Sequence, residues 1–374
     1  RLALARLLNR LGRAGEAKTE LLSAAECAAD KPDDLIKLAM TARDLGLAGL
    51  AVRQFRRFLE LVPGHFEAEA LMRDLQTSQV RPWHFRMMND QPRNRAYDAA
   101  LRRAIGPDSH VLEIGTGSGL LAMMAARAGA ALVTTCEMAD LVAEAAAEIV
   151  RHNNLSGRIK VIAKKSTELQ VGTDLPRPAD ILLSEILGDR LLSEEVLRST
   201  ADARRRLTRP DAILIPRRVS AIARLVGGDM FADAVSVGRV EGFDLSPFNR
   251  FTPSAISISM ESGSYESLSD DVEVFRFDLA ELEHKPGEAR PCFTANRNGT
   301  CLGVLQWLRL QLHDDIYFEN SPAERIAPSA WRQVFYPFKA PVEIRQGDRV
   351  QLRAKHDLNN LAFALEGHIR PDVH

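Results

Sequence analysis

The sequence predicts a doubly wound α/β domain that follows a helical segment and precedes an antiparallel β-barrel. Three patterns support this fold class. Apolar residues recur with helical spacing over 1–78, strands alternate with helices from about 105 to 216, and short strands separated by Gly, Pro and Asp follow. A chain of 374 residues is long enough for two or three domains. We therefore expect domains at 1–78, 79–216 and 217–374.

The helical segment contains two matching stretches at an offset of 34 residues. LGRAGEA begins at Leu11 and LGLAGLA begins at Leu45. A small-residue turn between two helices that recurs every 34 residues is typical of tetratricopeptide repeats. The alternative is a pair of helical hairpins that match by chance. Because the concave faces of such arrays commonly bind peptides, a peptide partner is expected on this segment.

The middle segment alternates strands and helices in the way that a parallel sheet requires. The predicted strands are 110–114, 132–137, 159–163, 179–185 and 212–216, and the predicted helices are 119–128, 139–152 and 194–207. In open α/β sheets, ligands bind at the carboxyl ends of the strands. Polar residues that follow a predicted strand are therefore the candidates for a functional site.

After Pro216 the helical pattern fades, and apolar runs such as AISISM and VLQWLRLQL indicate an antiparallel barrel or sandwich. Residues 229–252 interrupt these runs with a segment of mixed character. That segment is expected to present an apolar surface interrupted by Gly and Pro, formed by Met230, Phe231, Phe243, Leu245, Phe248 and Phe251.

Composition narrows the classes of function. The net charge of −1 makes a general attraction to nucleic acid or anionic lipid unexpected. No apolar run approaches the 18 residues of a membrane helix. The four cysteines are scattered without a CxxC pair, which indicates reduced thiols in a cytoplasmic protein and neither a zinc site nor a disulfide framework; they are Cys27, Cys136, Cys292 and Cys301.

A glycine-rich motif follows the first predicted strand. Gly115, Gly117 and Gly119 stand directly after HVLEI and open the next helix, where they let the backbone turn tightly and approach a ligand. The GxGxG spacing suits S-adenosylmethionine better than a dinucleotide, because no pyrophosphate has to be bound. Glu137 ends the second strand and can accept hydrogen bonds from both ribose hydroxyls. The alternative is that the glycines serve only helix–strand packing.

Two carboxylates flank a short loop after the fourth strand. Glu185 ends the apolar run PADILLS, and Glu194 follows nine residues later. Two carboxylates that face one cavity suit guanidinium, which offers five donors in a fixed fork. The alternative for Glu194 is an acid at a helix N-terminus, where it favours the helix dipole. Glu195 is a candidate substitute if the loop is shifted by one residue.

With these motifs, the sequence from about Arg81 to the end resembles the protein arginine N-methyltransferase family. The glycine motif, Glu137 and the acid pair match its cofactor and double-glutamate motifs. The start of the chain is most similar to the subgroup with N-terminal tetratricopeptide repeats. The resemblance implies a Rossmann-like methyltransferase domain followed by a β-barrel, with S-adenosylmethionine as the cofactor and Glu185 and Glu194 as the catalytic residues.

Further site residues are implied by the resemblance. MMNDQPRN at 87–94 resembles the helix in which an arginine grips the cofactor carboxylate, here Arg93, and His84 stands where the family often has a cofactor-contacting histidine. Ser166 and Thr167 stand at the adenine-binding position, where the family often has glutamate.

The substrate side is less complete. SAWRQVFY at 329–336 resembles the family's Thr-His-Trp loop but keeps only Trp331. Met87 is expected to line the site, with ordinary core packing as the alternative. The aromatic helix that lids the cofactor in the family has no clear match before Arg81.

The sequence therefore predicts methyl transfer to a guanidino nitrogen of arginine in protein substrates. Two alternatives remain: a non-catalytic adaptor with a decayed methyltransferase body, and a methyltransferase that acts on a small guanidine or amine. The resemblance also implies a homodimer in which the arm at about 229–252 packs on the second subunit. Neither a metal, a membrane nor direct nucleic-acid binding is expected.

Overall fold

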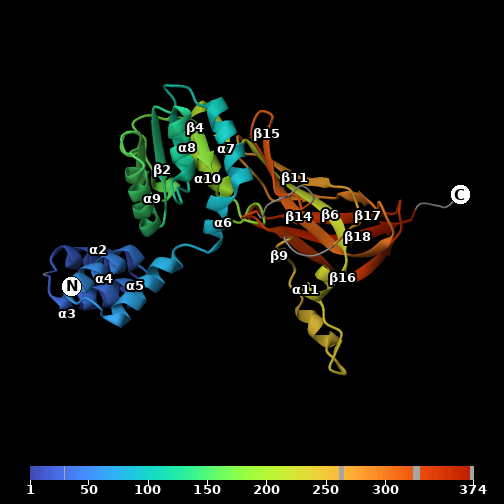
Figure 1. Ribbon diagram of the computed structural model, residues 1–374, viewed down its shortest axis with the longest axis horizontal. Coiled ribbons are helices and arrows are strands. Elements are labelled where there is room, and N and C mark those ends of the chain that lie inside the picture. The colour runs from blue at the N-terminus through green and yellow to red at the C-terminus, as the bar shows by residue number, and fades with distance from the viewer. Residues whose placement is uncertain (29, 261–264, 323–328, 371–374) are drawn as a thin grey trace.

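The computed structural model describes residues 1–28, 30–260, 265–322 and 329–370. Figure 1 shows three regions in chain order: a group of helices, an α/β domain and a β-rich domain from which an arm extends. This confirms the predicted fold class. Within the described ranges, no helix is long and apolar enough to cross a membrane.

The N-terminal helices form a small domain with a core of its own. They are α1 (Leu2–Arg10), α2 (Ala14–Glu26), α3 (Pro32–Asp44), α4 (Ala48–Leu61) and α5 (Phe66–Ser78). Leu21, Leu38 and Phe55 are buried in that core. Gly12 and Gly46 make the α1–α2 and α3–α4 turns at φ of +75° and +71°, a conformation that glycine adopts without strain. The two matching stretches of sequence therefore mark two equivalent turns.

These helices rest on the α/β domain through α4 and α9 (Asp140–His152). Arg56 on α4 lies 3.5 Å from Glu144 on α9. A Cβ atom on Gly49 would fall 1.8 Å from Oδ2 of Asp140, so any other residue here would require the carboxylate of Asp140 to move. The helical domain is thus attached to the helix that follows Glu137.

The α/β domain has a five-stranded parallel sheet in the order β3-β2-β1-β4-β5. Its strands are β1 (His110–Ile114), β2 (Leu132–Cys136), β3 (Ile159–Ile162), β4 (Ala179–Ser184) and β5 (Thr208–Ile215). Its helices besides α9 are α6 (Trp83–Asn89), α7 (Gln91–Ala104), α8 (Leu120–Ala128), the short η1 (Ser166–Glu168) and α10 (Val196–Arg206). The strand order reverses between β1 and β4, and a sheet of this kind binds its ligand at that reversal.

One predicted boundary differs where it affects the site. The predicted helix at 194–207 begins only at Val196, because Glu195 adopts a left-handed conformation with φ of +57°. Glu194 therefore belongs to the loop before the helix and is not on its first turn. The alternative that Glu194 is an acid on the first turn of this helix therefore does not hold.

The β-rich domain consists of two antiparallel sheets. The larger sheet contains β6 (Arg218–Gly227), β9 (Ile256–Ile258), β10 (Glu266–Ser267), β11 (Val272–Asp278), β14 (Gly299–His313), β15 (Ile316–Glu319) and β16 (Gln333–Ile344). The smaller contains β12 (Gly287–Ala289), β13 (Cys292–Thr294), β17 (Arg349–His356) and β18 (Leu361–Ile369). Aromatic contacts join the sheets, for example Tyr336 with Phe363 at 4.7 Å between ring centroids.

The arm contains α11 (Asp229–Val235), β7 (Arg239–Val240), β8 (Phe243–Asp244) and η2 (Ser246–Phe251). Figure 1 shows it extending from the β-rich domain on the side where the N-terminal helices also lie. Phe231, expected on the surface of the arm, is instead fully buried against Leu305 and Phe335 and anchors its base. The exposed aromatic side chains are Phe243, Phe248 and Phe251.

Candidate active site

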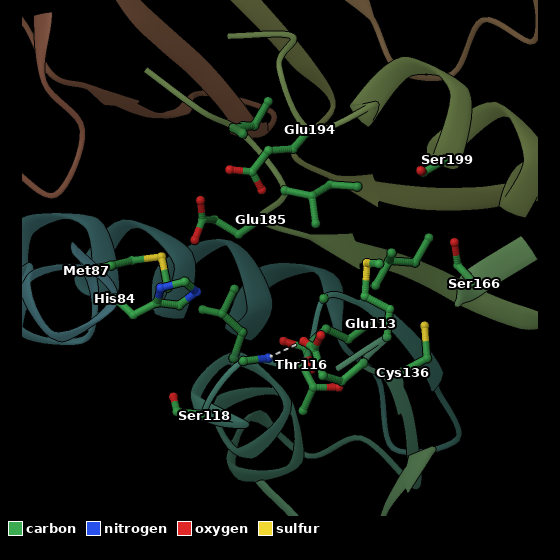
Figure 2. A pocket seen from close by; sticks show the side chains of 18 of the residues that line it. His84, Met87, Glu113, Thr116, Ser118, Cys136, Ser166, Glu185, Glu194 and Ser199 are labelled. Atoms are coloured by element: carbon green, nitrogen blue, oxygen red, sulfur yellow. Dashed lines mark hydrogen bonds between the residues drawn. The ribbon is translucent and has the colours of Figure 1, made fainter. Parts of the chain in front are cut away.

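A cavity of about 450 Å³ opens at the carboxyl ends of β1, β2 and β4. Figure 2 shows the side chains around it. The cavity brings together most residues that the sequence singled out: His84, Met87, Arg93, Gly115, Gly117, Glu137, Ser166, Glu185 and Glu194. They come from both ends of the α/β domain's sequence, so only the fold makes them neighbours.

The glycine loop forms the floor beside β1. Gly115 and Gly117 have φ of +83° and +51°, and a Cβ on Gly115 would lie 2.7 Å from Ile186. The backbone N–H of Gly117 donates to Oε2 of Glu137 at 3.2 Å, and that of Ala139 donates to Oε1 at 3.0 Å. The carboxylate of Glu137 is thereby held at the end of β2 with the cavity before it.

A series of hydrogen bonds between buried polar side chains supports the glycine loop. Thr135 donates to Oε2 of Glu113 at 2.5 Å, and the hydroxyls of Thr135 and Thr116 lie 2.6 Å apart. Burial raises the pKa of Glu113 to about 8, although the hydrogen bond from Thr135 opposes the shift. Glu113 is thus largely protonated near neutral pH, which suits a group enclosed beneath a loop.

Helix α6 lines the cavity on the side away from the sheet. Trp83 stacks on His84 with ring centroids 3.8 Å apart, and His84, Met87 and Met88 contribute to the lining. A lid helix had no clear match before Arg81 in the sequence. In the structure, the aromatic and methionine side chains that line the cavity on this side come after Arg81, from Trp83, His84, Met87 and Met88.

Arg93 is a cationic side chain that is buried beside Glu185. Its Nη2 donates to Oε2 of Glu185 at 2.7 Å, and its Nη1 donates to Asn94 at 2.7 Å. Burial is the largest single influence and lowers the pKa of Arg93, but the charges of Glu185, Tyr97 and Asp90 and the hydrogen bond to Glu185 together raise it overall. Its Nε is buried and has no hydrogen-bond partner among the described residues. A ligand carboxylate would supply that partner, so Arg93 fits the role assigned to it.

Figure 2 shows the carboxylates of Glu185 and Glu194 close to one another at one end of the cavity, and the charge of Glu194 acts on Glu185. Burial raises the pKa of Glu185 to about 7 against the opposing effect of Arg93. Loss of solvation at the cavity, followed by the charge of Asp189, raises the pKa of Glu194, although the residue as a whole is exposed to solvent. Two carboxylates with raised pKa values form a site that gains from a bound cation.

Glu195 is placed differently from its neighbour. Its Oε2 lies 3.4 Å from Nζ of Lys165, and its Oε1 lies 4.0 Å from Arg198. Glu195 and Lys165 also line the cavity, but the carboxylate of Glu195 is already paired with these two cations. The structure therefore favours Glu194 over Glu195 as the second acid.

Three predicted residues are absent from the cavity lining within the described chain: Gly119, Thr167 and Trp331. Gly119 begins α8 and packs near Ala146 and Val150, which matches the packing alternative. Thr167 is exposed, whereas Ser166 is 4% exposed and lines the cavity. Trp331 lies behind the loop between the glutamates, where its Nε1 donates to the carbonyl of Leu187 at 2.6 Å.

Comparison with known proteins decides the family. The chain is 38% identical to the arginine N(omega)-methyltransferase of Streptomyces achromogenes subsp. streptozoticus, over 73% of this chain and 76% of that protein. This chain belongs to the arginine N-methyltransferase family. As a member it is an S-adenosylmethionine-dependent methyltransferase.

Other similarities agree with this family. The methyltransferase is 29% identical to protein arginine N-methyltransferase 7 of Drosophila melanogaster, over 74% of this chain but only 46% of that protein. Residues 99–215 match the ribosomal protein L11 methyltransferase (PrmA) family. A solved structure with the same fold is the Trypanosoma brucei PRMT1 enzyme-prozyme heterotetrameric complex with AdoHcy, with a TM-score of 0.68 and 24% identity, covering 78% of this chain and 95% of that chain.

Proposed function

We propose that this methyltransferase transfers the methyl group of S-adenosylmethionine to a guanidino nitrogen of arginine in protein substrates. The observation that carries the proposal is that Glu185 and Glu194 share one cavity with the glycine loop and Glu137. The cofactor-binding half and the guanidinium-binding half of the reaction are thereby side by side.

The residues around the cavity divide into two groups by their chemistry. Glu137 offers two carboxylate oxygens to ribose hydroxyls, and Ser166 lies at the adenine side. Arg93 offers its free Nε to the methionyl carboxylate, while His84 and Met87 cover the cavity. When bound, S-adenosylmethionine supplies a methyl group on a positively charged sulfur. Gly115 and Gly117 leave the backbone close enough for that ligand.

The two glutamates perform the work on the substrate side. Arginine stays protonated, so the lone pairs of its nitrogens are delocalised and poor nucleophiles. Glu185 and Glu194 concentrate positive charge on the nitrogens that they bind, which leaves more lone-pair density on the remaining nitrogen. They also hold that nitrogen in line with the methyl group. The nitrogen that receives the methyl group loses a proton, which Glu185 or Glu194 would accept and pass to solvent.

A second candidate substrate is free arginine. The relative at 38% identity is named an arginine N(omega)-methyltransferase, without the word protein, and its alignment covers 76% of its length. The helical domain and the large β-rich domain support a protein substrate instead, because a single amino acid needs neither surface. The adaptor reading finds less support, since the cavity keeps its glycine loop and both acids.

The decisive experiment uses the purified chain with radiolabelled S-adenosylmethionine. Arg/Gly-rich peptides, full-length proteins and free arginine are offered in parallel. A higher kcat/KM for the peptides supports the proposal, and labelling of free arginine alone replaces it with the second candidate. Calorimetry with S-adenosylmethionine tests the adaptor, which would not bind it. Fragmentation mass spectrometry identifies the monomethyl or dimethyl product.

The finer organisation is also proposed. We place the domain limits at 1–78, 79–216 and 217–374, and we propose that α1–α5 form tetratricopeptide repeats that bind a peptide partner. The equivalent glycine turns at 12 and 46 support this. Exposed Phe243, Phe248 and Phe251 support a homodimer formed through the arm. Four free cysteines support a reducing, cytoplasmic location.

A further inference from the structure

A short loop of the β-rich domain lies between the two halves of the active site. This bracket loop, Ser329–Arg332, is the segment that resembles the Thr-His-Trp loop with two of its three side chains changed. On one side it contacts the start of α7, and on the other the catalytic loop, residues 186–193, which joins Glu185 to Glu194.

Asp90 connects the bracket loop to Glu185. Its Oδ2 accepts the backbone N–H of Ala330 at 3.3 Å and the hydroxyl of Ser329 at 3.2 Å. Its Oδ1 accepts the backbone N–H of Arg93 at 3.1 Å, and Arg93 donates to Glu185 at 2.7 Å. Asp90 is 2% exposed, so these bonds form in a dry environment where they are strong.

Asp189 makes the corresponding connection on the side of Glu194. Its Oδ1 accepts the backbone N–H of Arg332 at 2.9 Å. Trp331 adds a second bond to the catalytic loop through Leu187 at 2.6 Å. The loop has little freedom besides, because Leu191 and Leu192 are fully buried. These bonds to the bracket loop thereby fix the position of Glu194, which follows the catalytic loop.

We propose that Asp90 and Asp189 are positioning residues, each of which sets one catalytic glutamate by binding a backbone N–H of the bracket loop. This inference rests on the proposed function of Glu185 and Glu194. Main-chain donors exist whatever side chains residues 330 and 332 carry. The chain therefore keeps the geometry of the site although Ala330 has no polar group.

The test compares alanine, which removes the acceptor, with asparagine, which keeps an oxygen at Oδ1. Asp189→Ala should lower kcat/KM for the arginine substrate by about 10- to 100-fold, because small misplacements of reacting groups are costly. Its Kd for S-adenosylhomocysteine should not change. Asp189→Asn should stay within about threefold of wild type. Asp90→Ala should lower kcat/KM similarly and also weaken the cofactor analogue, since it loosens Arg93.

Two controls separate positioning from general stability. Asp348 is likewise 2% exposed and accepts the backbone N–H of Arg345 at 2.9 Å, but it lies in the turn between β16 and β17. Asp348→Ala should lose stability and keep kcat/KM below its unfolding temperature. Ala330→Gly and Arg332→Ala keep the main-chain donors and should behave like wild type.

Hydrogen exchange supplies a readout that does not need activity. The amides of 186–194 should exchange faster in Asp189→Ala and Asp90→Ala than in wild type or Asp348→Ala. If wild type methylates no arginine substrate, the proposed function fails, while the exchange rates still decide the positioning. Unchanged exchange and kcat/KM in both alanine variants would overturn the inference, as would equal losses in Ala330→Gly. If Asp189→Ala does not fold, a tenfold loss in Asp189→Asn decides against it.

Discussion

Arg93 and Glu185 form a buried ion pair, with 2.7 Å between Nη2 and Oε2 and side chains that are 3% and 5% exposed. Breaking such a pair by removing one partner is costly because a charge is left uncompensated. The Nε of the same guanidinium has no hydrogen-bond partner among the described residues, and in the proposed mechanism it binds the cofactor carboxylate. Glu185 is therefore already oriented before a substrate arrives.

Removal of the charge on Glu185 should abolish most catalysis. We expect Glu185→Gln to cost roughly 2–4 kcal/mol of transition-state stabilisation, or about 30- to 1000-fold in kcat. Glu195→Gln is the matched control and should be mild, because Lys165 and not the substrate binds that carboxylate. Single-turnover assays on both variants check this. Equal effects of the two changes would contradict the assignment of Glu185.

The rate should fall on the acid side of neutrality. Burial raises the pKa of Glu185 to about 7, and the pKa of Glu194 is raised as well. Only the ionised forms attract guanidinium, so protonation below about pH 7 should reduce kcat/KM. A profile of kcat/KM from about pH 5.5 to about pH 9 covers both sides of this pKa and measures the fall in rate. A flat profile across that range would show that the glutamates are ionised throughout.

The glycine loop should control cofactor affinity. Gly117 has φ of +51° with no atom within 4 Å of its Cβ position, so Gly117→Val adds both strain and bulk. Glu137→Ala removes the ribose acceptor. Calorimetry should show weaker binding of S-adenosylmethionine in each. Gly129→Ala is the control, because Gly129 has φ of +113° at the end of α8, away from the cavity, and its loss should affect stability alone.

Glu113 should make stability depend on pH. Its pKa is raised to about 8 in the folded chain from an ordinary value of 4.5. The folded state therefore holds the proton more tightly, and this contribution is complete below about pH 4.5 and is lost as the pH rises toward 8. Glu113→Gln, which cannot ionise, should reduce the fall in Tm between pH 6 and 9, roughly the range of that loss. Identical Tm profiles for the variant and wild type would exclude a buried, protonated Glu113.

The arm should support self-association. Phe243 and Phe248 are 71% and 67% exposed on the extended segment. Light scattering on wild type should give a dimer, and Phe243→Asp/Phe248→Asp should weaken it by placing charge in an apolar contact. A monomeric and fully active wild type would rule the dimer out. A dimer that resists the double change would rule out this arm as its cause.

The α/β domain was predictable because each strand is short, apolar and followed by a helical period. Strands β1 to β4 lie within about one residue of their expected limits. The glycine loop, Glu137, Glu185 and Glu194 follow such strands, so their meeting at one edge of the sheet could be inferred from the sequence. Figure 2 shows that edge.

The parts that sequence reasoning missed depend on contacts between distant segments. Asp90 and Asp189 bind a loop that lies about 140 residues or more further along the chain, and the sequence alone does not contain that proximity. A local signal existed for Asp90, which stands before Pro92 in the pattern of a helix N-cap. The prediction for Phe231 was wrong. An aromatic residue in an irregular segment can be buried against the neighbouring domain or exposed on the surface, and only the fold distinguishes the two.

The close crossing at Gly49 connects the N-terminal helices to the part of the α/β domain that carries Glu137. Any side chain at this position would displace the carboxylate of Asp140, the first residue of α9. That helix begins three residues after Glu137, whose carboxylate is fixed in part by the backbone of Ala139. The lack of a side chain at Gly49 thus lets the N-terminal helices approach the helix that follows the strand end carrying Glu137.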